Sequence, residues 1–486
     1  MLDLKPTLIW KHFHGLTQVP RPSKKEEKIL AYLKQLVTDL GYAYEQDPTG
    51  NLVVRKPATP GFENAPTVLI QGHVDMVCEK NKGTEFDFDN DPIRTVIEGE
   101  WLTADGTTLG ADNGIGVAAG LAVLEAKDLI HPPMEFLFTV DEETGLTGAK
   151  GLQPGFLTAS MMLNLDSEED GALYVGCSGG MDTAGVMIVT EEAAPEGWVS
   201  YDVMVSGLKG GHSGLDIHTG RGSAIKILAR TISELAEKAG VRVSVITGGS
   251  KRNAIPREAE ACLYLDPAHA DTAMGIVAGL QEMFLNEIGS VEPGLSVSLT
   301  SCTGNGKVMA REQQETLLHV LHAMPHGVLK MSADIPGLVE TSTNLATITR
   351  TDDRLVVGSS QRSSVESEKF DAVRQVGAVF SLAGLTVEYG DGYPGWKPNM
   401  QSLALKYVRE AYRSLYAAEP EIKAIHAGLE CGLIGEVFPG MDMISFGPTI
   451  MGAHSPDEKI SIPMVSKFWD LLVKVLDDIA RSGRNA

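Results

Sequence analysis

The sequence predicts an α/β protein whose mainly parallel, helix-covered sheet is interrupted by an inserted α+β domain of ferredoxin-like type. Three observations support this class. Apolar strands alternate with helices in the first part of the chain, amphipathic elements then follow in the order β-α-β-β-α-β, and the first pattern returns at the end. We therefore expect an outer domain of residues 1–186 and 388–486, with an inserted domain of residues 187–387.

The first part of the outer domain alternates between helices and strands. Residues 22–41 have helical periodicity and end at a glycine, a residue that often follows the last turn of a helix. Buried strands are expected at 67–77, 134–141 and 161–166, and helices at 113–127 and 144–152. Strands joined through helices usually pair in parallel, so we expect helices on both faces of this sheet.

The inserted domain has a different rhythm. Its strands are expected at 201–208, 242–248, 257–265 and 296–302, with helices at 221–239 and 269–288. A second, partial copy follows, although no repeat is detectable in the sequence: a helix at 312–324, a hairpin at 343–361 and a helix at 367–384. The outer domain then resumes with a helix at 400–417, a strand at 441–447 and a helix at 463–481.

Composition and charge exclude several kinds of partner. The 486 residues include 41 Lys and Arg against 64 Asp and Glu, a formal net charge of −23. Such a chain has little to replace the counterions of nucleic acid or to attract anionic lipid. No apolar run approaches the ~20 residues that span a bilayer. Five scattered cysteines without a CxxC motif, and an N-terminus unlike a secretory signal, predict a cytoplasmic protein with free thiols.

Four segments rich in acidic residues or histidine lie at or just beyond expected strand ends. This is where α/β proteins bind ligands. The segment GHVDM carries His73 and Asp75 on one face of a strand, so the carboxylate could orient a metal-binding imidazole. A histidine with satisfied hydrogen bonds in the core is the commoner alternative. The segment TTLGADNGIG carries Asp112, which could bridge two cations or simply cap the helix that follows.

Two further acidic segments follow apolar strands. TVDEETG contains Glu142 and Glu143, of which one could hold a metal while the other accepts a proton from water; a solvated loop end is an equal alternative. LNLDSEEDG places Asp166 at the end of a buried strand, where a cation would offset the cost of a buried charge. Far downstream, FGPTIMGAHSPDE supplies His454, which could otherwise be an ordinary loop histidine.

Together these segments provide a mixed set of imidazole and carboxylate ligands: His73, Asp112, Glu143, Asp166 and His454. Such ligands suit zinc, and also manganese or cobalt. Five ligands are too many for one tetrahedral ion, but they fit two ions if Asp112 bridges. Each ion then has one histidine, one further carboxylate and a share of Asp112, which leaves open positions for water and substrate.

The chain resembles the di-zinc metallopeptidases that include aminoacylases, bacterial carboxypeptidases and succinyl-diaminopimelate desuccinylases, and among them it is most similar to the bacterial cytosolic non-specific dipeptidases. The segments that carry the resemblance span nearly the whole chain: RKPAT, GHVDMV, GTTLGADNGIG, NLDSEE, GLKGGHSG, RNAIPREA, YPGW, IHAGLECGL and GPTIMGAHSPDE. The resemblance implies a catalytic outer domain, an inserted lid domain, two Zn²⁺ per subunit with Co²⁺ or Mn²⁺ as substitutes, and a homodimer formed through the lid.

The resemblance also assigns roles in the outer domain. It implies that the five residues above are the metal ligands, that Asp112 bridges the ions, and that Asp112 precedes a cis peptide bond to Asn113. Asp75 would orient His73, and Glu142 would be the general base. These roles are what the family implies and go beyond what the spacing of the residues establishes.

In the inserted domain and just after it, the resemblance implies a set of substrate-binding residues. His212 of GLKGGHSG would help to stabilise the oxyanion, while Asn253, Arg362 and Gly428 would hold the free carboxylate of the substrate. Arginine binds carboxylates through two parallel hydrogen bonds, which agrees with this role. Without the resemblance, His212 could be a turn residue and Arg362 a surface arginine.

The implied activity is hydrolysis of dipeptides with free termini, Xaa-His among them. An N-acyl-amino-acid amidohydrolase or a carboxypeptidase on the same scaffold is the nearest alternative, because the metal ligands do not separate these reactions. A non-catalytic protein that binds metal or peptide is an alternative of another class. Small dipeptides are the expected partners; nucleic acid and membranes are not.

Overall fold

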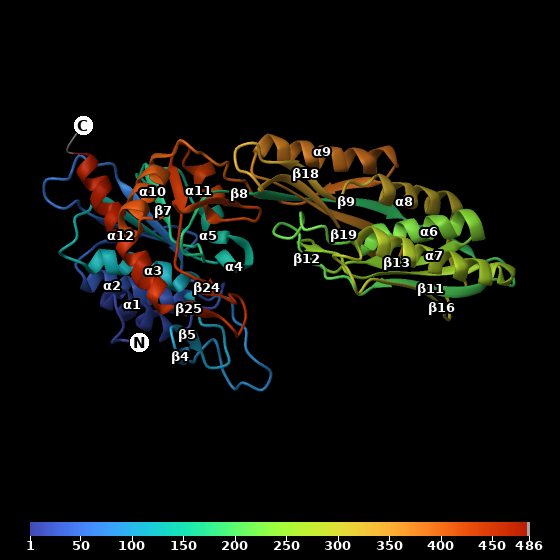
Figure 1. The fold of residues 1–486 in the computed structure, drawn as a ribbon, viewed down its shortest axis with the longest axis horizontal. Coiled ribbons are helices and arrows are strands. Elements are labelled where there is room, and N and C mark those ends of the chain that lie inside the picture. Colours follow the sequence, from blue (N-terminus) through green and yellow to red (C-terminus); the bar gives the residue numbers. More distant parts are fainter. Residues whose placement is uncertain (484–486) are drawn as a thin grey trace. The chain divides into compact units, whose positions relative to one another are not determined.

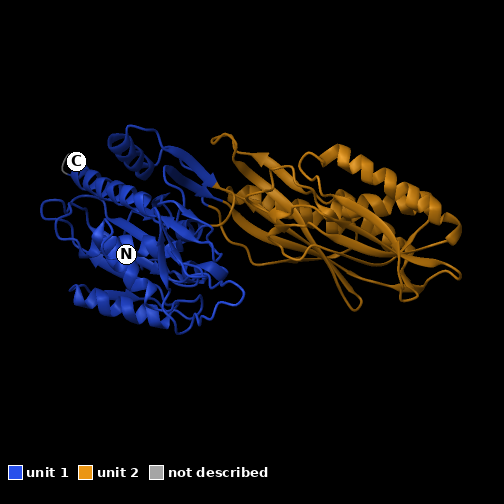
Figure 2. Cartoon of the chain, turned by 60° about the horizontal axis from the view of Figure 1, so that its bottom comes forward, with its two compact units in different colours: residues 1–177, 396–424, 429–486 blue, residues 178–395, 425–428 orange. Residues whose placement is uncertain are grey.

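The structure is a computed structural model that describes residues 1–483, and the chain divides into two compact units. Unit 1 holds residues 1–177 and 396–424 and resumes at residue 429, whereas unit 2 holds residues 178–395 and 425–428 (Figure 2). The borders expected at 186/187 and 387/388 both fall inside strands of unit 2, β9 (Gly179–Ile188) and β21 (Thr386–Tyr389). These two strands pair with each other, so one sheet extends across both expected borders.

Unit 1 is built on an eight-stranded sheet in the order β1-β2-β6-β3-β7-β23-β8-β22. Its strands are β1 (Tyr44–Gln46), β2 (Leu52–Lys56), β3 (Val68–His73), β6 (Met134–Thr139), β7 (Met161–Asn164), β8 (Ala172–Cys177), β22 (Glu421–Ile425) and β23 (Asp442–Ser445). The central strands β6, β3, β7 and β23 pair in parallel, while β2 pairs antiparallel to β6. The central strands are fully buried except at Asp442, in keeping with apolar runs covered on both faces.

Helices flank this sheet in Figure 1. They are α1 (Thr7–Thr17), α2 (Glu27–Asp39), α3 (Ala111–Glu125), α4 (Glu142–Gly145), α5 (Thr147–Gly151), α10 (Leu403–Tyr416), α11 (Glu430–Val437) and α12 (Ile462–Ser482). A small second sheet has the order β24-β25-β5-β4, with β4 (Thr95–Glu98), β5 (Trp101–Ala104), β24 (Ile450–Met451) and β25 (Lys459–Ser461). The sequence did not predict α1, α11 or this small sheet.

Unit 2 contains a nine-stranded antiparallel sheet in the order β16-β11-β15-β13-β19-β20-β9-β21, with β18 beside β19. Its further strands are β11 (Val199–Ser206), β13 (Arg242–Gly248), β15 (Ala259–Leu265), β16 (Ser296–Ser301), β18 (Gly327–Met331), β19 (Val339–Thr351) and β20 (Arg354–Ser363). Its helices are α6 (Ala224–Ala239), α7 (Ala270–Ile288), α8 (Arg311–Ala323) and α9 (Glu366–Leu382). They lie along one face of the sheet, over a common apolar core (Figure 1).

Two runs of the order β-α-β-β-α-β make up unit 2. The first is β11-α6-β13-β15-α7-β16, and the second is β9-α8-β19-β20-α9-β21. The first run separates β9 from the rest of the second, which explains why the sequence revealed only a partial second copy. The remaining short elements are η1 (Pro267–His269) and two strand pairs: β10 (Glu191–Ala193) with β17 (Lys307–Met309), and β12 (Gly211–His212) with β14 (Ala254–Ile255).

Two expectations from composition can be compared with the structure. All five cysteines carry free thiols, as predicted. Among residues 1–483, no helix is both long and apolar enough to cross a membrane.

Candidate metal centre

The ends of the central strands of unit 1 bring three of the expected ligands to one edge of the sheet. His73 is the last residue of β3, Glu143 lies in α4 shortly after β6, and Asp166 lies two residues beyond β7. Because these strands run in parallel, their carboxyl ends meet at the same edge, where α/β sheets bind ligands.

The other two ligands come from a helix start and a loop. Asp112 lies at the beginning of α3, and its peptide bond to Asn113 is cis, as the family resemblance implied. His454 lies in the loop between β24 and β25, with φ at +62°, a conformation uncommon for a non-glycine residue. Segments far apart in the sequence therefore converge on one site.

The five side chains form two groups that share Asp112. In the first group, His73 Nε2 lies 3.2 Å from Asp112 Oδ1 and 3.3 Å from Asp166 Oδ1. In the second, His454 Nε2 lies 3.1 Å from Asp112 Oδ2 and 3.1 Å from Glu143 Oε2. Each oxygen of Asp112 thus faces a different histidine, which is the arrangement that a bridging carboxylate requires and a helix cap does not.

Burial and unsatisfied polar atoms show that this site suits cations. The side chains of His73, Glu143 and Asp166 are 1%, 4% and 6% exposed. Within residues 1–483, Glu143 Oε1 and Asp166 Oδ1 are buried without a hydrogen-bond donor. Three acidic side chains this close would repel one another unless positive charge lay between them. The donor atoms of each group lie within 4.8 Å of one another, and imidazole with carboxylate is a donor set that Zn²⁺, Mn²⁺ and Co²⁺ accept.

The protonation of the site reflects the same crowding. Burial, with added repulsion from the Asp112 and Glu143 charges, raises the pKa of Asp166 to about 6. Hydrogen bonds to Asp112 and Glu143 raise the pKa of His454 to about 11. Since a histidine that binds a metal must give up its proton, protons and cations compete at His454.

Asp75 connects the first ligand to the loop after β6. Its Oδ1 lies 3.3 Å from His73 Nδ1 and accepts the backbone N–H of Glu142 at 3.1 Å. Its Oδ2 accepts the Ser23 hydroxyl at 2.7 Å and the backbone N–H of Glu143 at 3.3 Å. Although burial acts in the opposite direction, the interactions with His73 lower the pKa of Asp75 to about 2. Asp75 therefore stays ionised beside the His73 ring.

Glu142, the expected base, lies beside the expected ligand Glu143 at the start of α4. Burial is the largest cause of a pKa raised well above the usual value for a glutamate, and the nearby Asp166 charge adds to it. A carboxylate with a raised pKa holds a proton more readily than an ordinary glutamate, which suits a general base.

Glu458 contacts the turn that carries Asp112, a contact that the sequence analysis missed. Its buried carboxylate accepts the backbone N–H groups of residues 109–112, at distances between 2.7 and 3.2 Å. On the other side of this turn, the buried Arg21 donates to the carbonyl oxygens of Asp75 and Gly110. The segment GAHSPDE was noted for His454 alone; an acidic residue four positions later gives no signal of its own in the sequence.

A second missed residue, Glu430, is the first residue of α11 and accepts hydrogen bonds from strands of the sheet. Its Oε2 accepts hydrogen bonds from Gln71 Nε2 at 2.5 Å and from the Thr139 hydroxyl at 2.7 Å, and Gln71 in turn accepts from Asn164 Nδ2. Burial raises the pKa of Glu430 to about 7. This polar network joins β6, β3 and β7 near their carboxyl ends, close to the expected ligands at and beyond those ends.

The expected substrate-binding residues all belong to unit 2. His212 Nδ1 accepts the backbone N–H groups of Gly214 at 3.2 Å and Leu215 at 3.1 Å. Burial lowers the pKa of His212 to about 4, so the ring is neutral and its proton belongs on Nε2. His212 is therefore a hydrogen-bond donor through Nε2.

Asn253, Arg362 and Gly428 are linked to the same part of unit 2. The carbonyl oxygen of Asn253 accepts the Ser213 N–H at 2.8 Å, and Arg362 Nε donates to the Ser213 hydroxyl at 3.4 Å. Arg362 Nη1 also donates to the Tyr393 hydroxyl at 2.9 Å. A Cβ atom on Gly428 would approach the Tyr393 ring to 2.9 Å, so a glycine leaves room for this tyrosine.

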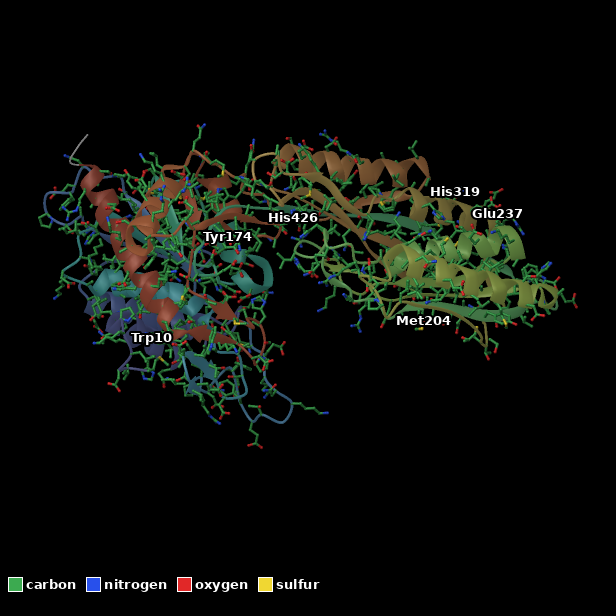
Figure 3. The ribbon with its side chains drawn as sticks, in the orientation of Figure 1. Trp10, Tyr174, Met204, Glu237, His319 and His426 are labelled. Carbon is green, nitrogen blue, oxygen red and sulfur yellow. The ribbon has the colours of Figure 1, made fainter. Side chains whose placement is uncertain are left out.

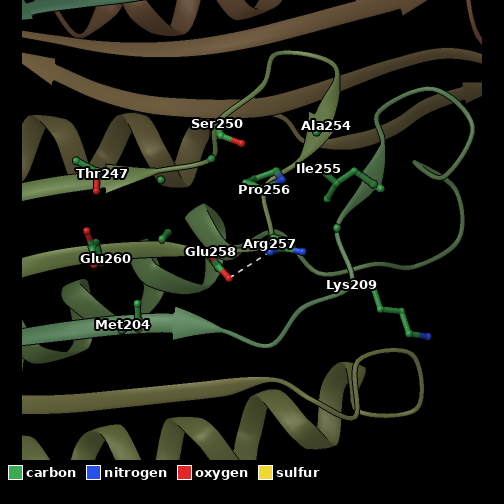
Figure 4. A pocket seen from close by; sticks show the side chains of 15 residues that line it. Met204, Lys209, Thr247, Ser250, Ala254, Ile255, Pro256, Arg257, Glu258 and Glu260 are labelled. Atoms are coloured by element: carbon green, nitrogen blue, oxygen red, sulfur yellow. Dashed lines mark ion pairs between the residues drawn. The ribbon is translucent and has the colours of Figure 1, made fainter. Parts of the chain in front are cut away.

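A cavity of about 570 Å³ opens elsewhere in unit 2, between the loop at Lys209 and the strand ends around Arg257 (Figure 4). None of the expected ligands or substrate-binding residues lines it. Its size alone therefore does not identify it with the site described above.

Comparison with known proteins places these residues in context. The model of "Peptidase family M20/M25/M40" matches residues 69–478. The cytosol non-specific dipeptidase of Escherichia coli (strain K12) is 42% identical over 477 residues, which cover 98% of both chains. The crystal structure of aminoacylhistidine dipeptidase from Vibrio alginolyticus has 43% identity and a TM-score of 0.91, over 98% of this chain and 97% of that one. A tripeptidase from Staphylococcus aureus, with 18% identity and a TM-score of 0.57 over 98% and 99% of the chains, shares the fold.

Proposed function

This chain belongs to peptidase family M20/M25/M40, and we propose that it is a metal-dependent dipeptidase that hydrolyses dipeptides with free termini, Xaa-His among them. Two similar proteins, at 42% and 43% identity, are named as dipeptidases. The observation that carries the proposal is the pair of histidine–carboxylate groups that share Asp112.

We assign one Zn²⁺ to each group, with Co²⁺ or Mn²⁺ as substitutes. His73, Asp112 and Asp166 would hold the first ion; Asp112, Glu143 and His454 would hold the second. When bound, two such ions lower the pKa of water and polarise the carbonyl of the scissile peptide bond. Asp75 holds His73 with Nδ1 toward the carboxylate and leaves Nε2 for the metal.

Glu142 carries the proton in this proposal. Its carboxylate accepts a proton from the attacking water and delivers it to the nitrogen of the departing amine. The raised pKa supports this role, because the protonated form is then stable enough to exist between the two transfers. The neighbouring Glu143 is occupied as a ligand and does not compete for the proton.

For the residues of unit 2, we propose the roles that the family implies. His212 donates a hydrogen bond from Nε2 to the carbonyl oxygen as negative charge develops there. Asn253, Arg362 and Gly428 bind the free carboxylate of the substrate, for which the guanidinium of Arg362 is geometrically suited. Recognition of the free carboxylate beside the scissile bond favours dipeptides over longer peptides.

The test is Glu142→Gln, which keeps the shape of the side chain but removes the base. We expect kcat to fall about 100- to 10,000-fold while the bound metal, by elemental analysis, stays equal to that of the unmodified protein. Glu169→Gln is the matched control, since Glu169 is half exposed and pairs with Lys423. Near-normal turnover of Glu142→Gln would discard Glu142 as the base, and loss of metal would make it a ligand instead.

A substrate panel separates the alternatives. A dipeptide should be hydrolysed well, a tripeptide poorly and an N-acetyl amino acid least; preference for the N-acetyl compound would favour an amidohydrolase, and preference for the longer peptide a carboxypeptidase. Treatment with a chelator should abolish hydrolysis, and Zn²⁺ or Co²⁺ should restore it. If hydrolysis never occurs in metal-loaded protein, a non-catalytic binding protein is the better description.

We further propose that the protein works in the cytoplasm as a homodimer formed through unit 2. The name of the Escherichia coli relative supports the location. The strand β18 supports the interface, since Val328, Leu329 and Met331 are 36%, 40% and 45% exposed on it. Light scattering of the purified chain tests this proposal, with a mass of one subunit as the contradicting result.

A further inference from the structure

A second group of metal-binding side chains lies in unit 2, on the face of the large sheet opposite the helices. Its members are Asp202 on β11, Cys262 on β15 and Cys302 just after β16. Their ligand atoms all lie within 4.8 Å of one another. The neighbouring Met204, labelled in Figures 3 and 4, is 40% exposed and marks the same solvent-facing side of β11.

The strand pairing explains why the three side chains meet. β11 lies between β16 and β15, and Asp202 is directly opposite Cys262. The backbone N–H of Cys302 donates to the Ser200 carbonyl oxygen at 3.1 Å, which holds Cys302 on the other edge of β11. Ser200 is the β11 neighbour of Cys302, and Asp202 is the β11 neighbour of Cys262. Because residues 200 and 202 have side chains on one face of the strand, the two cysteines lie on that same face and reach toward each other over β11.

The loop that carries Cys302 is fixed to this face by further hydrogen bonds. The backbone N–H of Gly304 donates to the Ser200 hydroxyl at 2.9 Å. The backbone N–H of Gly306 donates to the Tyr264 hydroxyl at 2.6 Å. The position of Cys302 is therefore set by the fold and does not depend on one flexible side chain.

The distance between the sulfurs matches tetrahedral coordination. Cys262 Sγ and Cys302 Sγ are 3.7 Å apart. Zinc–thiolate bonds are about 2.3 Å long, so two thiolates on one tetrahedral Zn²⁺ stand roughly 3.8 Å apart. A cation could thus occupy the space between these sulfurs with little movement of either cysteine, and the Asp202 carboxylate is within reach as a third ligand.

A disulfide fits this geometry less well. Neighbouring strands are about 4.8 Å apart, so residues on the two outer strands of three are separated by roughly 9.5 Å. The Cα atoms of a disulfide are usually about 4.4–6.8 Å apart. Since β11 separates Cys262 from Cys302, an ion that joins the sulfurs requires less distortion of the sheet than a direct bond.

We propose that Asp202, Cys262 and Cys302 form a second metal site, for a thiophilic divalent cation such as Zn²⁺. The site is reached from solvent, because Asp202 is exposed and both cysteines are partly exposed. Each thiol loses its proton to solvent as the metal binds, and a water completes the fourth position. The cation connects β15 to the loop after β16 across β11, and so stabilises this part of unit 2.

Cobalt spectroscopy distinguishes this site from the candidate centre in unit 1. Only thiolate ligands give the intense near-ultraviolet charge-transfer band of Co²⁺, and the centre in unit 1 has nitrogen and oxygen ligands alone. The full chain is stripped with a chelator, kept reduced with a phosphine, and titrated with Co²⁺. We expect the band in the unmodified protein and in the control Cys78→Ser, and its loss in Cys262→Ser and in Cys302→Ser.

Metal content and stability provide independent readouts. After gel filtration in Zn²⁺, the unmodified protein should hold one equivalent more than the variant with both Cys262→Ser and Cys302→Ser, and Zn²⁺ should raise its melting temperature further. Circular dichroism verifies that the variants fold. The proposal is overturned by folded protein without the band, by a band that survives both substitutions, by equal zinc content, or by a disulfide between these cysteines. None of these results depends on dipeptidase activity.

Discussion

Replacement of Glu458 by glutamine tests whether the position of the bridging ligand is set by a residue outside the ligand set. Oε2 of Glu458 accepts the N–H groups of Leu109 and Gly110, and Oε1 accepts those of Ala111 and Asp112. In Glu458→Gln, an NH₂ group takes the place of one of these oxygens. Two of the four backbone donors then face another donor in a buried site, although the side chain keeps its size.

The expected loss follows from these contacts. A hydrogen bond to a charged group contributes about 1.5–3 kcal/mol, so the loss of two lowers the free energy of unfolding by about 3–6 kcal/mol. The charge also matters to Arg21, which is 2% exposed and is stabilised by the Glu458 carboxylate. A second effect is about 10- to 100-fold weaker metal binding, because the turn that presents Asp112 is released.

The assay is urea unfolding of metal-free protein, together with a zinc competition titration. Asp457→Asn is the matched control: this exposed neighbour should change the free energy of unfolding by less than about 0.5 kcal/mol and leave zinc affinity unchanged. If Glu458→Gln unfolds within 1 kcal/mol of the unmodified protein and binds zinc equally well, the carboxylate does not hold the turn and the reasoning fails.

Three further predictions concern the remaining charges. In metal-free protein the folded-state pKa of His454, about 11, exceeds its usual value of 6.5, so its contribution to stability is complete below 6.5 and disappears as pH rises toward 11. Because His454 must lose this proton to bind a metal, zinc affinity should rise with pH. A pH-independent affinity in competition titrations would contradict this prediction. Burial raises the pKa of Glu430 from 4.5 to about 7, so the stability of the folded state falls as pH rises from 4.5 to about 7 and the full cost of the buried charge is present at pH 8. Metal-free Glu430→Gln should therefore match or exceed the unmodified protein in urea stability at pH 8, and lower stability there would be evidence against this reasoning. Arg362→Lys removes the paired donors proposed for the substrate carboxylate and should raise KM for dipeptides about 10- to 100-fold with a smaller change in kcat; an unchanged KM would remove Arg362 from substrate binding.

The sequence was most informative where function depends on strand ends. His73, Glu143 and Asp166 each follow an apolar run, and parallel pairing of such runs is enough to bring their side chains to one edge. His454 had no such local signal, because its loop belongs to a small sheet of four short strands with little periodicity. Its place in the ligand set came from residue type and from the resemblance.

The fold was least predictable where elements distant in sequence share a sheet. β9 lies next to β20 and β21 in unit 2, yet it follows directly on strands of unit 1 in the chain. A border drawn at a change of sequence pattern therefore cut through it. Glu458 and Glu430 were missed for a related reason: each acts through contacts with backbone or polar groups more than 250 positions away, which local patterns do not record.

The contacts around the ligands indicate that the site is organised before a cation arrives. Asp75, two residues after His73 on the chain, accepts the backbone N–H groups of Glu142 and Glu143, and so joins the segment of His73 to that of Glu143. Glu458, in the loop of His454, accepts the backbone N–H of Asp112 and so joins these two segments. Since each of these carboxylates binds backbone from another ligand segment, removal of either should loosen two ligands at once. Removal of a ligand side chain, by contrast, leaves the backbone of the other four in place, because their segments are held together by these contacts and not by the metal.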